Sequence, residues 1–256
     1  MAMNPKLLRP KASVAPFSPQ AIAGLALWLD AADASSITLN GNGVSAWGDK
    51  SENGLSVIQP TALYQPQYTA TIGGKPALLF GGAASPAFLG CEGGSFANET
   101  FFMVAARNNG SQEAYAALFA YRQSANTYLS SDADSEFVLN RGTVSDDALG
   151  FDPITSTPTL YTNGVNIPAG SVDGIATENS YSSSPFAVAD AQSLLTIYSG
   201  TSIAGAKPFI IGADAYEPAS RTYRATVGEI LIYQNALSEA ERQSVEAYLM
   251  SKWGIT

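Results

Sequence analysis

The stretch TVGEILIYQNALSEAERQSVEAYLMSKWG, residues 226–254, contains the clearest fold information in this chain. Its first part, residues 226–233, is mostly apolar and has the length of a buried strand. Ser238 is followed three residues later by Glu241, which is the spacing of a helix capping box. The apolar residues that then recur at helical spacing before the terminating Gly254 are Val245, Tyr248, Leu249 and Trp253. The pattern predicts a buried strand and then one helix whose apolar face packs on the rest of the protein.

Short apolar runs bounded by Gly, Ser, Asn and Pro recur through the rest of the chain. Most have the length of a strand in a sheet. They lie at residues 25–29, 76–80, 101–106, 114–122, 137–140, 159–162, 194–198 and 209–212. The Asn163-Gly164 pair favours a tight hairpin turn because both residues tolerate positive φ. We therefore predict an all-β body to which the C-terminal helix is added.

The composition agrees with short strands and frequent turns. Of the 256 residues, 46% are hydrophobic and only 14% are charged, with 23 glycines and 14 prolines. A disordered chain would carry far fewer apolar residues. A chain of this length can bury most of its apolar surface in one core. We predict one domain over residues 20–256, preceded by a distinct N-terminal segment, residues 1–19.

Charge and residue usage make several function classes unfavourable. The net charge of −9 disfavours a nucleic-acid surface, which needs clustered Lys and Arg. The sequence has no histidine, so the usual general base, the Ser-His-Asp triad and the commonest zinc ligand are all missing. Cys91 is the single cysteine and forms no intrachain disulfide. No apolar run approaches the roughly 18 to 20 residues of a membrane span.

The N-terminal segment, residues 1–19, is basic and rich in proline, and it lacks the apolar core of a secretory signal. Its prolines remove backbone donors and disfavour helix, so the segment is predicted to be extended. One interpretation is a frayed terminus. The other is an arm that docks on a capsid or tail protein. The residues expected to make that contact are Lys6, Leu7, Leu8, Arg9, Lys11 and Phe17.

Two groups of motifs resemble a known superfamily. Near the N-terminus stand GLALWLDAAD, residues 24–33, and VSAWGDKSENG, residues 44–54; the C-terminal motifs are residues 228–233, 236–242 and 248–254. Together they resemble the concanavalin A-like lectin/glucanase superfamily in its laminin G-like form, which is common in bacterial surface proteins and phage proteins. The resemblance implies a two-sheet antiparallel β-sandwich, or jelly roll. It constrains the fold more than the function, because this fold serves lectins, hydrolases and inert spacers.

The residues of these motifs favour structural roles. Trp28 and Trp47 are expected to fill the core near the first strand and the turn that follows it. Side-chain oxygens suited to capping amides in a tight loop are supplied by Asp49, Ser51 and Asn53.

Glu229 interrupts an apolar strand, so we expect its carboxylate to be paired, because an unpaired buried charge is costly. The candidate partners are Arg107, Arg221 and Arg224. Asp30 and Asp33 are expected to cap turns, with calcium ligation as the alternative.

An alternating acidic triplet is the constellation closest to a catalytic site. Asp132, Asp134 and Glu136 would share one face of a strand. Retaining glucanases of related fold carry a similar triplet, in which two carboxyls about 5–5.5 Å apart act together. Here the first acid is Asp instead of Glu and no aromatic residue is interleaved. We favour an ordinary acidic loop, with weak calcium binding as the alternative and hydrolysis as a remote one.

A candidate carbohydrate site lies in the loop between two predicted strands, residues 213–224. Sugar binding needs exposed aromatic rings beside carboxylate, amide or guanidinium groups. The residues that offer them are Asp214, Tyr216, Arg221 and Tyr223. Ordinary loop decoration is the alternative.

These features predict a non-enzymatic virion structural protein of a tailed phage: a capsid decoration, head fibre or tail-associated protein. Such a protein would be made in the host cytoplasm and displayed on the virion surface, docked on capsid or tail proteins through residues 1–19. The alternative is a carbohydrate-binding adhesin domain of a bacterial surface protein, and a glycoside hydrolase is a remote one. We expect no cofactor except a possible Ca²⁺, no nucleic-acid or membrane partner, a possible glycan ligand and a possible homo-oligomer.

Overall fold

The architecture comes from a computed structural model of the chain. It describes residues 17–81, 86–91, 100–108, 116–122, 135–140, 150–152, 159–162, 164–167, 192–198, 208–214 and 218–256. The only long helix among these residues, at the C-terminus, is neither long nor apolar enough to cross a membrane.

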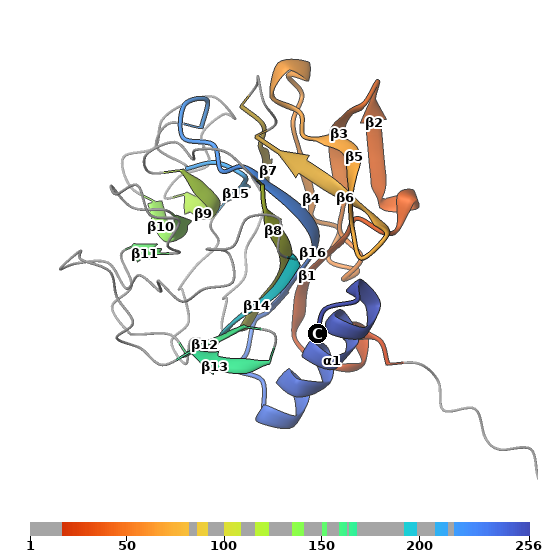
Figure 1. The fold of residues 1–256 in the computed structure, drawn as a ribbon, viewed down its shortest axis with the longest axis vertical. Helices are drawn as coiled ribbons and strands as arrows, with labels where there is room; N and C mark the ends of the chain where they lie inside the picture. The colour runs from red at the N-terminus through yellow and green to blue at the C-terminus, as the bar shows by residue number, and fades with distance from the viewer. Residues whose placement is uncertain are drawn as a thin grey trace, which may run out of the picture.

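The described chain is mostly antiparallel β with one C-terminal helix (Figure 1). In chain order the elements are η1 (Pro19–Ala21), β1 (Leu25–Asp30), η2 (Ala34–Ser36), β2 (Ile37–Asn40), β3 (Gly43–Gly48), β4 (Ser56–Ile58), η3 (Ala62–Tyr64), β5 (Gln67–Ile72), β6 (Lys75–Phe80), β7 (Leu89–Cys91), β8 (Thr100–Arg107), β9 (Ala117–Arg122), β10 (Ser135–Asn140), β11 (Gly150–Asp152), β12 (Thr159–Thr162), β13 (Val165–Ile167), β14 (Gln192–Tyr198), β15 (Phe209–Ile211), β16 (Ala225–Tyr233) and α1 (Glu239–Trp253).

Hydrogen-bonded ladders join all of these strands into one 16-stranded sheet. The sequence predicted two separate sheets, and within the described residues no second sheet is separate from the first. The all-β prediction is confirmed, whereas the two-sheet arrangement is not what the ladders show.

Strand β16 organises the sheet because its two edges are used differently. Along one edge it pairs with β8 from Ala225 to Tyr233. Along the other edge its first residues pair with β6 and its last residues pair with β1. From β6 the sheet continues through β5, β3, β4, β7, β15 and β9. The sheet therefore divides at β16 and curls (Figure 1).

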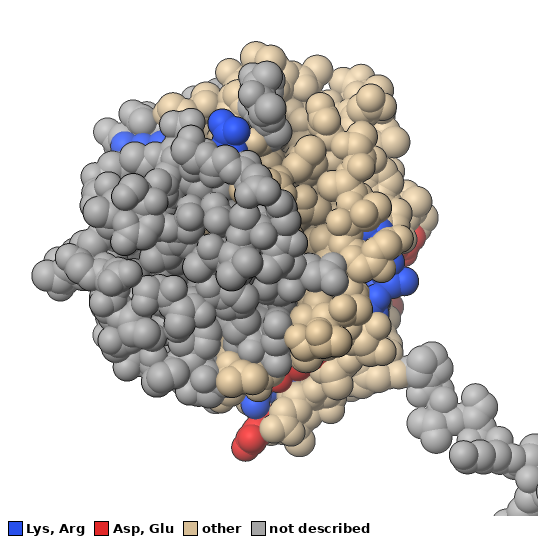
Figure 2. Space-filling view, viewed as in Figure 1, with Lys and Arg blue, Asp and Glu red and all other residues tan. Residues whose placement is uncertain are grey.

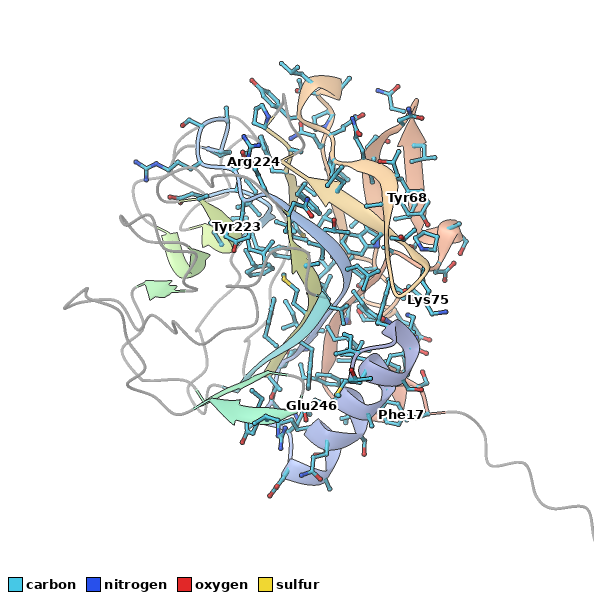
Figure 3. The ribbon with its side chains drawn as sticks, in the orientation of Figure 1. Phe17, Tyr68, Lys75, Tyr223, Arg224 and Glu246 are labelled. Carbon is cyan, nitrogen blue, oxygen red and sulfur yellow. The ribbon has the colours of Figure 1, made fainter. Side chains whose placement is uncertain are left out.

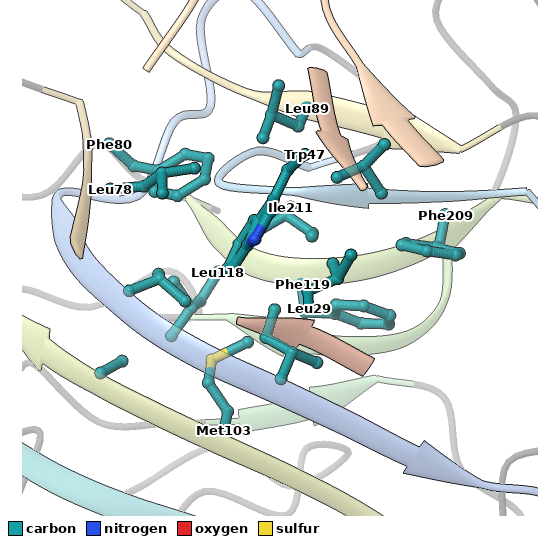
Figure 4. Close-up of a cluster of buried hydrophobic side chains, with 14 of the residues drawn as sticks. Leu29, Trp47, Leu78, Phe80, Leu89, Met103, Leu118, Phe119, Phe209 and Ile211 are labelled. Carbon is teal, nitrogen blue, oxygen red and sulfur yellow. The ribbon is translucent and has the colours of Figure 1, made fainter. Parts of the chain in front are cut away.

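The main core lies inside this curl. Buried side chains from β16 and β8 belong to one cluster with side chains from β3, β7, β9 and β15. Figure 4 shows Trp47 in the middle of this cluster, among Leu78, Leu118 and Ile211. The sheet has two limbs: the part around β16 and β8, and the part that contains β3, β7, β9 and β15. Because their facing apolar side chains are removed from water together, this core is the main stabilising contribution to the curled shape. Trp47 fills the core as predicted, but it stands on strand β3 and not in a turn.

The opposite face of β16 and β8 is covered by α1. Val245, Leu249 and Trp253 are buried there, as the sequence predicted, against apolar residues of the sheet such as Phe102 and Leu231. The helix begins at a complete capping box between Ser238 and Glu241 and ends with Gly254 in the left-handed conformation, at φ 65°. The predicted helix and both of its ends are confirmed.

The strands that the sequence missed lie mainly between residues 37 and 72. Strands β2, β3, β4 and β5 occupy this region, and a turn with Gly41 at φ 64° joins β2 to β3. Strand β2 is largely exposed and β5 alternates between exposed and partly buried residues, so neither has an apolar run. The hairpin predicted at Asn163-Gly164 is confirmed by β12 and β13, with Gly164 at φ 77°.

Candidate functional site

A buried polar cluster lies where β1, β16 and α1 meet. We call it the Glu229 cluster. Its members are Glu229 of β16, Trp28 and Asp30 of β1, and Tyr248, Lys252 and Trp253 of α1. It brings two buried carboxylates and a lysine together in the interior of the domain.

A β-bulge at Gly228 places Glu229 in the cluster. Between β16 and β8, Val227 pairs with Ala105 and Glu229 pairs with Val104, so Gly228 is the extra residue. One extra residue reverses the faces to which later side chains point. Val227 and Ile230 therefore both face the main core, while Glu229 faces α1. Without the bulge the carboxylate would point into the apolar core.

Gly228 is also needed for the close approach of the helix. A Cβ atom at this position would lie 2.9–3.1 Å from three atoms of the Trp253 indole ring. The backbone carbonyl of Gly228 accepts a hydrogen bond from the Ala31 amide at 2.9 Å. Gly228 thus bonds to the residue that follows β1 and leaves room for the Trp253 ring of the helix.

The Glu229 side chain is fully buried, yet both of its oxygens are well supplied with donors. Oε1 accepts from Trp28 Nε1 at 2.7 Å and from the Tyr248 hydroxyl at 3.3 Å. Oε2 accepts from Trp253 Nε1 at 2.6 Å and from Lys252 Nζ at 2.7 Å. These bonds satisfy a buried carboxylate that would otherwise be strongly destabilising.

Lys252 connects Glu229 to a second carboxylate. Its Nζ lies 2.7 Å from Asp30 Oδ1, and Asp30 is itself buried. Lys50 approaches Asp30 from the other side, with its Nζ 2.9 Å from Oδ2, and also lies 2.7 Å from Asp33 Oδ2. The Lys50 ammonium additionally sits 4.5 Å from the centre of the Trp28 ring. Three carboxylates thus alternate with two ammonium groups.

The surroundings shift the acidities of these groups. Burial raises the pKa of Glu229, and the nearby Lys252 charge opposes that rise. Burial likewise raises the pKa of Tyr248 above its ordinary value. Hydrogen bonds from Lys50 and Ser35 lower the pKa of Asp33 to about 2. Burial acts to lower the pKa of Lys50, but its bonds to Asp33 and Asp30 outweigh burial and the pKa lies above its usual value.

The loop after β3 fastens the outer edge of β1, as its Asp, Ser and Asn residues predicted. Asp49 Oδ1 accepts from the Trp28 amide at 2.9 Å and from the Ser51 amide at 2.8 Å. The Ser51 hydroxyl and the Asn53 side-chain amide both donate to the Ala26 carbonyl, each at 3.0 Å. Asp30 and Asp33 accept from the amides of Ala32 and Ser35, so the predicted turn capping is also confirmed.

The prediction that Glu229 is paired is confirmed, but the proposed arginine partners were wrong. Its partners are one lysine, two indoles and a phenol. Arg221 instead pairs with Asp214 at 3.2 Å. The sequence did not identify Lys252 as a partner, because the helical pattern was defined by its apolar residues and Lys252 is a polar residue next to Trp253. The spacing of Tyr248 and Lys252, one helical turn apart, was the available signal.

The predicted carbohydrate residues are only partly brought together. Asp214 and Arg221 form their ion pair, and the Asp214 amide also donates to the Arg221 carbonyl at 3.0 Å, which closes the base of the loop. Tyr223 is fully buried in the main core, so its ring offers no face to a sugar, contrary to the expectation of an exposed aromatic. Tyr216 lies outside the described residues.

The acidic triplet is largely outside the described chain. Asp132 and Asp134 are not among the described residues, and for Glu136 only the backbone is described, paired with Tyr121 between β10 and β9. Among the described residues, no group of three acids, cysteines or histidines is arranged to hold a metal ion.

The proposed contact residues of the N-terminal segment lie outside the described residues, except for Phe17. They are Lys6, Leu7, Leu8, Arg9 and Lys11. The Phe17 side chain packs beside α1 of its own chain, with its ring 5.8 Å from that of Tyr248 (Figure 3). Two residues later, the Pro19 carbonyl accepts from the buried Tyr233 hydroxyl at 3.0 Å, and the Gln20 side chain donates to the Lys50 carbonyl at 2.8 Å. The segment thus leaves the domain beside the Glu229 cluster.

Comparison with known proteins gives only distant likenesses. No protein-family model and no curated protein sequence matches the chain. Among solved structures, the binding domain of Paraclostridial Mosquitocidal Protein 1 aligns with 91% of this chain at 11% identity and a TM-score of 0.47. Trypanosoma rangeli sialidase aligns with 90% of it at 14% identity and a TM-score of 0.41.

The chain spans 53% of the toxin binding-domain chain and 33% of the sialidase chain. Likenesses at this level assign neither a family nor an activity.

Proposed function

We propose that this chain is a non-enzymatic structural domain of a tailed-phage virion, displayed on the particle surface and docked on capsid or tail proteins through residues 1–19. The observation that carries the proposal is the fastening of residues 17–20. Phe17, Pro19 and Gln20 contact α1, β16 and the loop after β3, respectively. A partner that binds the N-terminal segment would therefore pull on the domain at the place where β1, β16 and α1 are held together.

The use of the charged groups supports a non-enzymatic role. Glu229 is fully buried and hydrogen-bonded at both oxygens, so no substrate reaches it without displacing α1. Asp30 is likewise buried between Lys50 and Lys252. Figure 2 shows a mainly uncharged surface over the described residues of this face, with the basic and acidic groups in small patches. Such a surface suits packing against other proteins.

The jelly-roll fold is a second part of this proposal. We propose that the two limbs of the curled sheet act as the two layers of a sandwich of the concanavalin A-like kind. Its support is the main core, in which residues such as Met103 of β8 and Phe209 of β15 belong to one buried cluster. The loops between strands would then be exposed on the particle surface, while the N-terminal segment binds capsid or tail proteins.

Deleting residues 1–16 tests the docking proposal, because it leaves the Phe17–Gln20 contacts in place. We expect the shortened protein to fold like the full chain by circular dichroism and thermal unfolding, yet to be absent from purified particles. Triple charge reversal at Lys6, Arg9 and Lys11 should give the same result. The matched control is Lys75→Glu, a charge reversal at the start of β6 that should leave incorporation unchanged. Normal incorporation of the shortened protein would rule out docking through this segment.

Carbohydrate binding is a second candidate, favoured by the closed base of the loop between Asp214 and Arg221. An ion pair and a backbone bond at the base hold the two ends of the loop together, so less order has to be gained when a ligand binds. A glycan array with the full chain tests it. Binding that is lost in Tyr216→Ala supports an adhesin, and an array without any bound glycan removes this candidate.

A further inference from the structure

The Lys252 ammonium of the Glu229 cluster lies within hydrogen-bonding reach of two carboxylates. Lys252 Nζ is 2.7 Å from Asp30 Oδ1 and 2.7 Å from Glu229 Oε2. It is therefore an amine held between two carboxyl groups, one of which can be its reaction partner while the other moves protons.

Aromatic rings shield much of the site from water. The exposed fractions of the side chains are 17% for Lys252, 6% for Asp30 and 0% for Glu229. Lys252 Nζ lies 5.4 Å from the centre of the Trp253 ring and 5.5 Å from that of Tyr248. A site of low polarity favours neutral groups over charged ones. Burial raises the pKa of Glu229, which suits this carboxyl group to hold a proton in transit.

We infer that the Glu229 cluster forms an intramolecular amide bond between Lys252 Nζ and the side-chain carboxyl carbon of Asp30, with Glu229 as the proton carrier. The Lys252 ammonium first passes one proton to the Asp30 carboxylate, directly or through Glu229, which leaves a neutral amine and a neutral acid. The amine nitrogen attacks the Asp30 carboxyl carbon. Glu229 then takes a second proton from the nitrogen and delivers it to the departing oxygen.

The step balances without any further reactant. The bond from nitrogen to carbon forms, one carbon–oxygen bond of Asp30 breaks, and that oxygen leaves as water with the two protons lost by nitrogen. Glu229 ends in the state in which it began, and one positive and one negative charge disappear together. The remaining amide N–H is placed to donate to Glu229 Oε2, which already accepts from this nitrogen.

The surroundings of Asp30 assist the attack. The Ala32 amide donates to Oδ1 at 3.1 Å and the Lys50 ammonium donates to Oδ2 at 2.9 Å. Donors fixed on both oxygens stabilise the negative charge that develops when the amine adds.

Lys252, and not Lys50, is the reacting amine. Lys252 contacts Asp30 and the fully buried Glu229 together. Lys50 contacts Asp30 and Asp33, and the Asp33 side chain is 33% exposed, so it is open to water and a poor carrier of protons within a closed site. The bond from Lys252 would join β1 to α1 and close most of the domain into a covalent ring.

The mass of the purified full chain tests this inference directly. We expect the intact protein to be lighter by one water molecule than its sequence requires, and protease digestion to release a branched peptide joining Lys252 to Asp30. Lys252→Arg and Asp30→Ala should each have the full mass. Glu229→Gln should also have the full mass, because the amide cannot carry the proton. Lys75→Arg is the matched control: it changes a lysine at the start of β6, outside the Glu229 cluster, and should still lose water.

Two results would overturn the inference. A folded wild-type chain that keeps its full mass after prolonged incubation contains an ion pair and no bond. A water loss that maps to a single unbranched peptide, or to a branch through Lys50, has a different origin. The wild-type measurement is decisive even if a variant fails to fold, and it is independent of particle docking.

Discussion

At the scale of single residues, Glu229 shows how one backbone irregularity decides the environment of a charge. The bulge at Gly228 turns the carboxylate from the apolar core toward the donors of α1. Trp253 and Trp28 contribute apolar surface and one N–H each, so the same side chains exclude water and satisfy the charge. The cluster therefore depends on indole N–H groups as much as on the Lys252 charge.

Replacing Trp253 by Phe tests that dependence. We expect a loss of about 2 kcal/mol in the free energy of unfolding beyond the loss of packing, because a charged acceptor in the interior loses a donor. Trp47→Phe is the matched control, since within the described part of the chain the buried Trp47 Nε1 finds no hydrogen-bond partner. Urea unfolding of both variants measures the difference. Equal losses would show that the Trp253 N–H contributes nothing to stability.

Asp33 gives a prediction for acid stability. Its pKa falls from 3.8 to about 2 in the folded protein, so the unfolded chain takes up the proton first as the pH decreases. The stability that Asp33 contributes is complete above pH 4 and is lost as the pH falls toward 2. Because the side chain is one-third exposed, the contribution is less than about 1 kcal/mol.

Unfolding midpoints in urea between pH 5 and pH 2 should therefore fall more steeply for the wild type than for Asp33→Asn. Parallel curves would contradict the shift.

At the scale of elements, α1 depends on its two ends and its apolar face. The Ser238 side chain accepts from the Glu241 amide, and the Glu241 carboxylate accepts from the Ser238 amide at 2.8 Å. Ser238→Ala should lower the free energy of unfolding by about 1 kcal/mol. Ser244→Ala is the control, because Ser244 donates only to the Ala240 carbonyl on the exposed side of the helix and should be neutral. Thermal unfolding compares the two, and equal effects would mean that the cap is unimportant.

An element could be predicted from the sequence when its own residues carry the pattern, and could not when its structure depends on pairing with distant strands. Strand β16 and helix α1 carry continuous apolar or periodic patterns with local caps, so the sequence alone located both. Strands β2 to β5 are short and partly exposed, and their pairing partners decide their structure. The charge of Glu229 predicted a paired site, but the bulge that selects Lys252 as its partner depends on register with β8. Tyr223 was wrongly expected to be exposed, because the residues around it have the composition of a loop although its ring lies in the core.

At the scale of the whole molecule, helix α1 and residues 1–16 are expected to differ in what they contribute to stability. Helix α1 covers an apolar face that includes Phe102 and Leu231, and it supplies three of the four side chains that donate to Glu229. Residues 1–16 precede the first described contacts, which begin with Phe17 against Tyr248. The fold is therefore expected to tolerate loss of residues 1–16 but not loss of the helix.

Two truncations of the full chain test this asymmetry. Removal of residues 238–256 would expose the apolar face and leave Glu229 with Trp28 as its remaining donor, so we expect an aggregating protein that binds the hydrophobic dye ANS. Removal of residues 1–16 should leave the unfolding temperature within about 2 °C of the full chain, because no described contact is lost. A soluble, cooperatively folded product of the first truncation would show that the curled sheet is stable without α1. The Glu229 cluster would then be an attachment of the helix and not a condition of the fold.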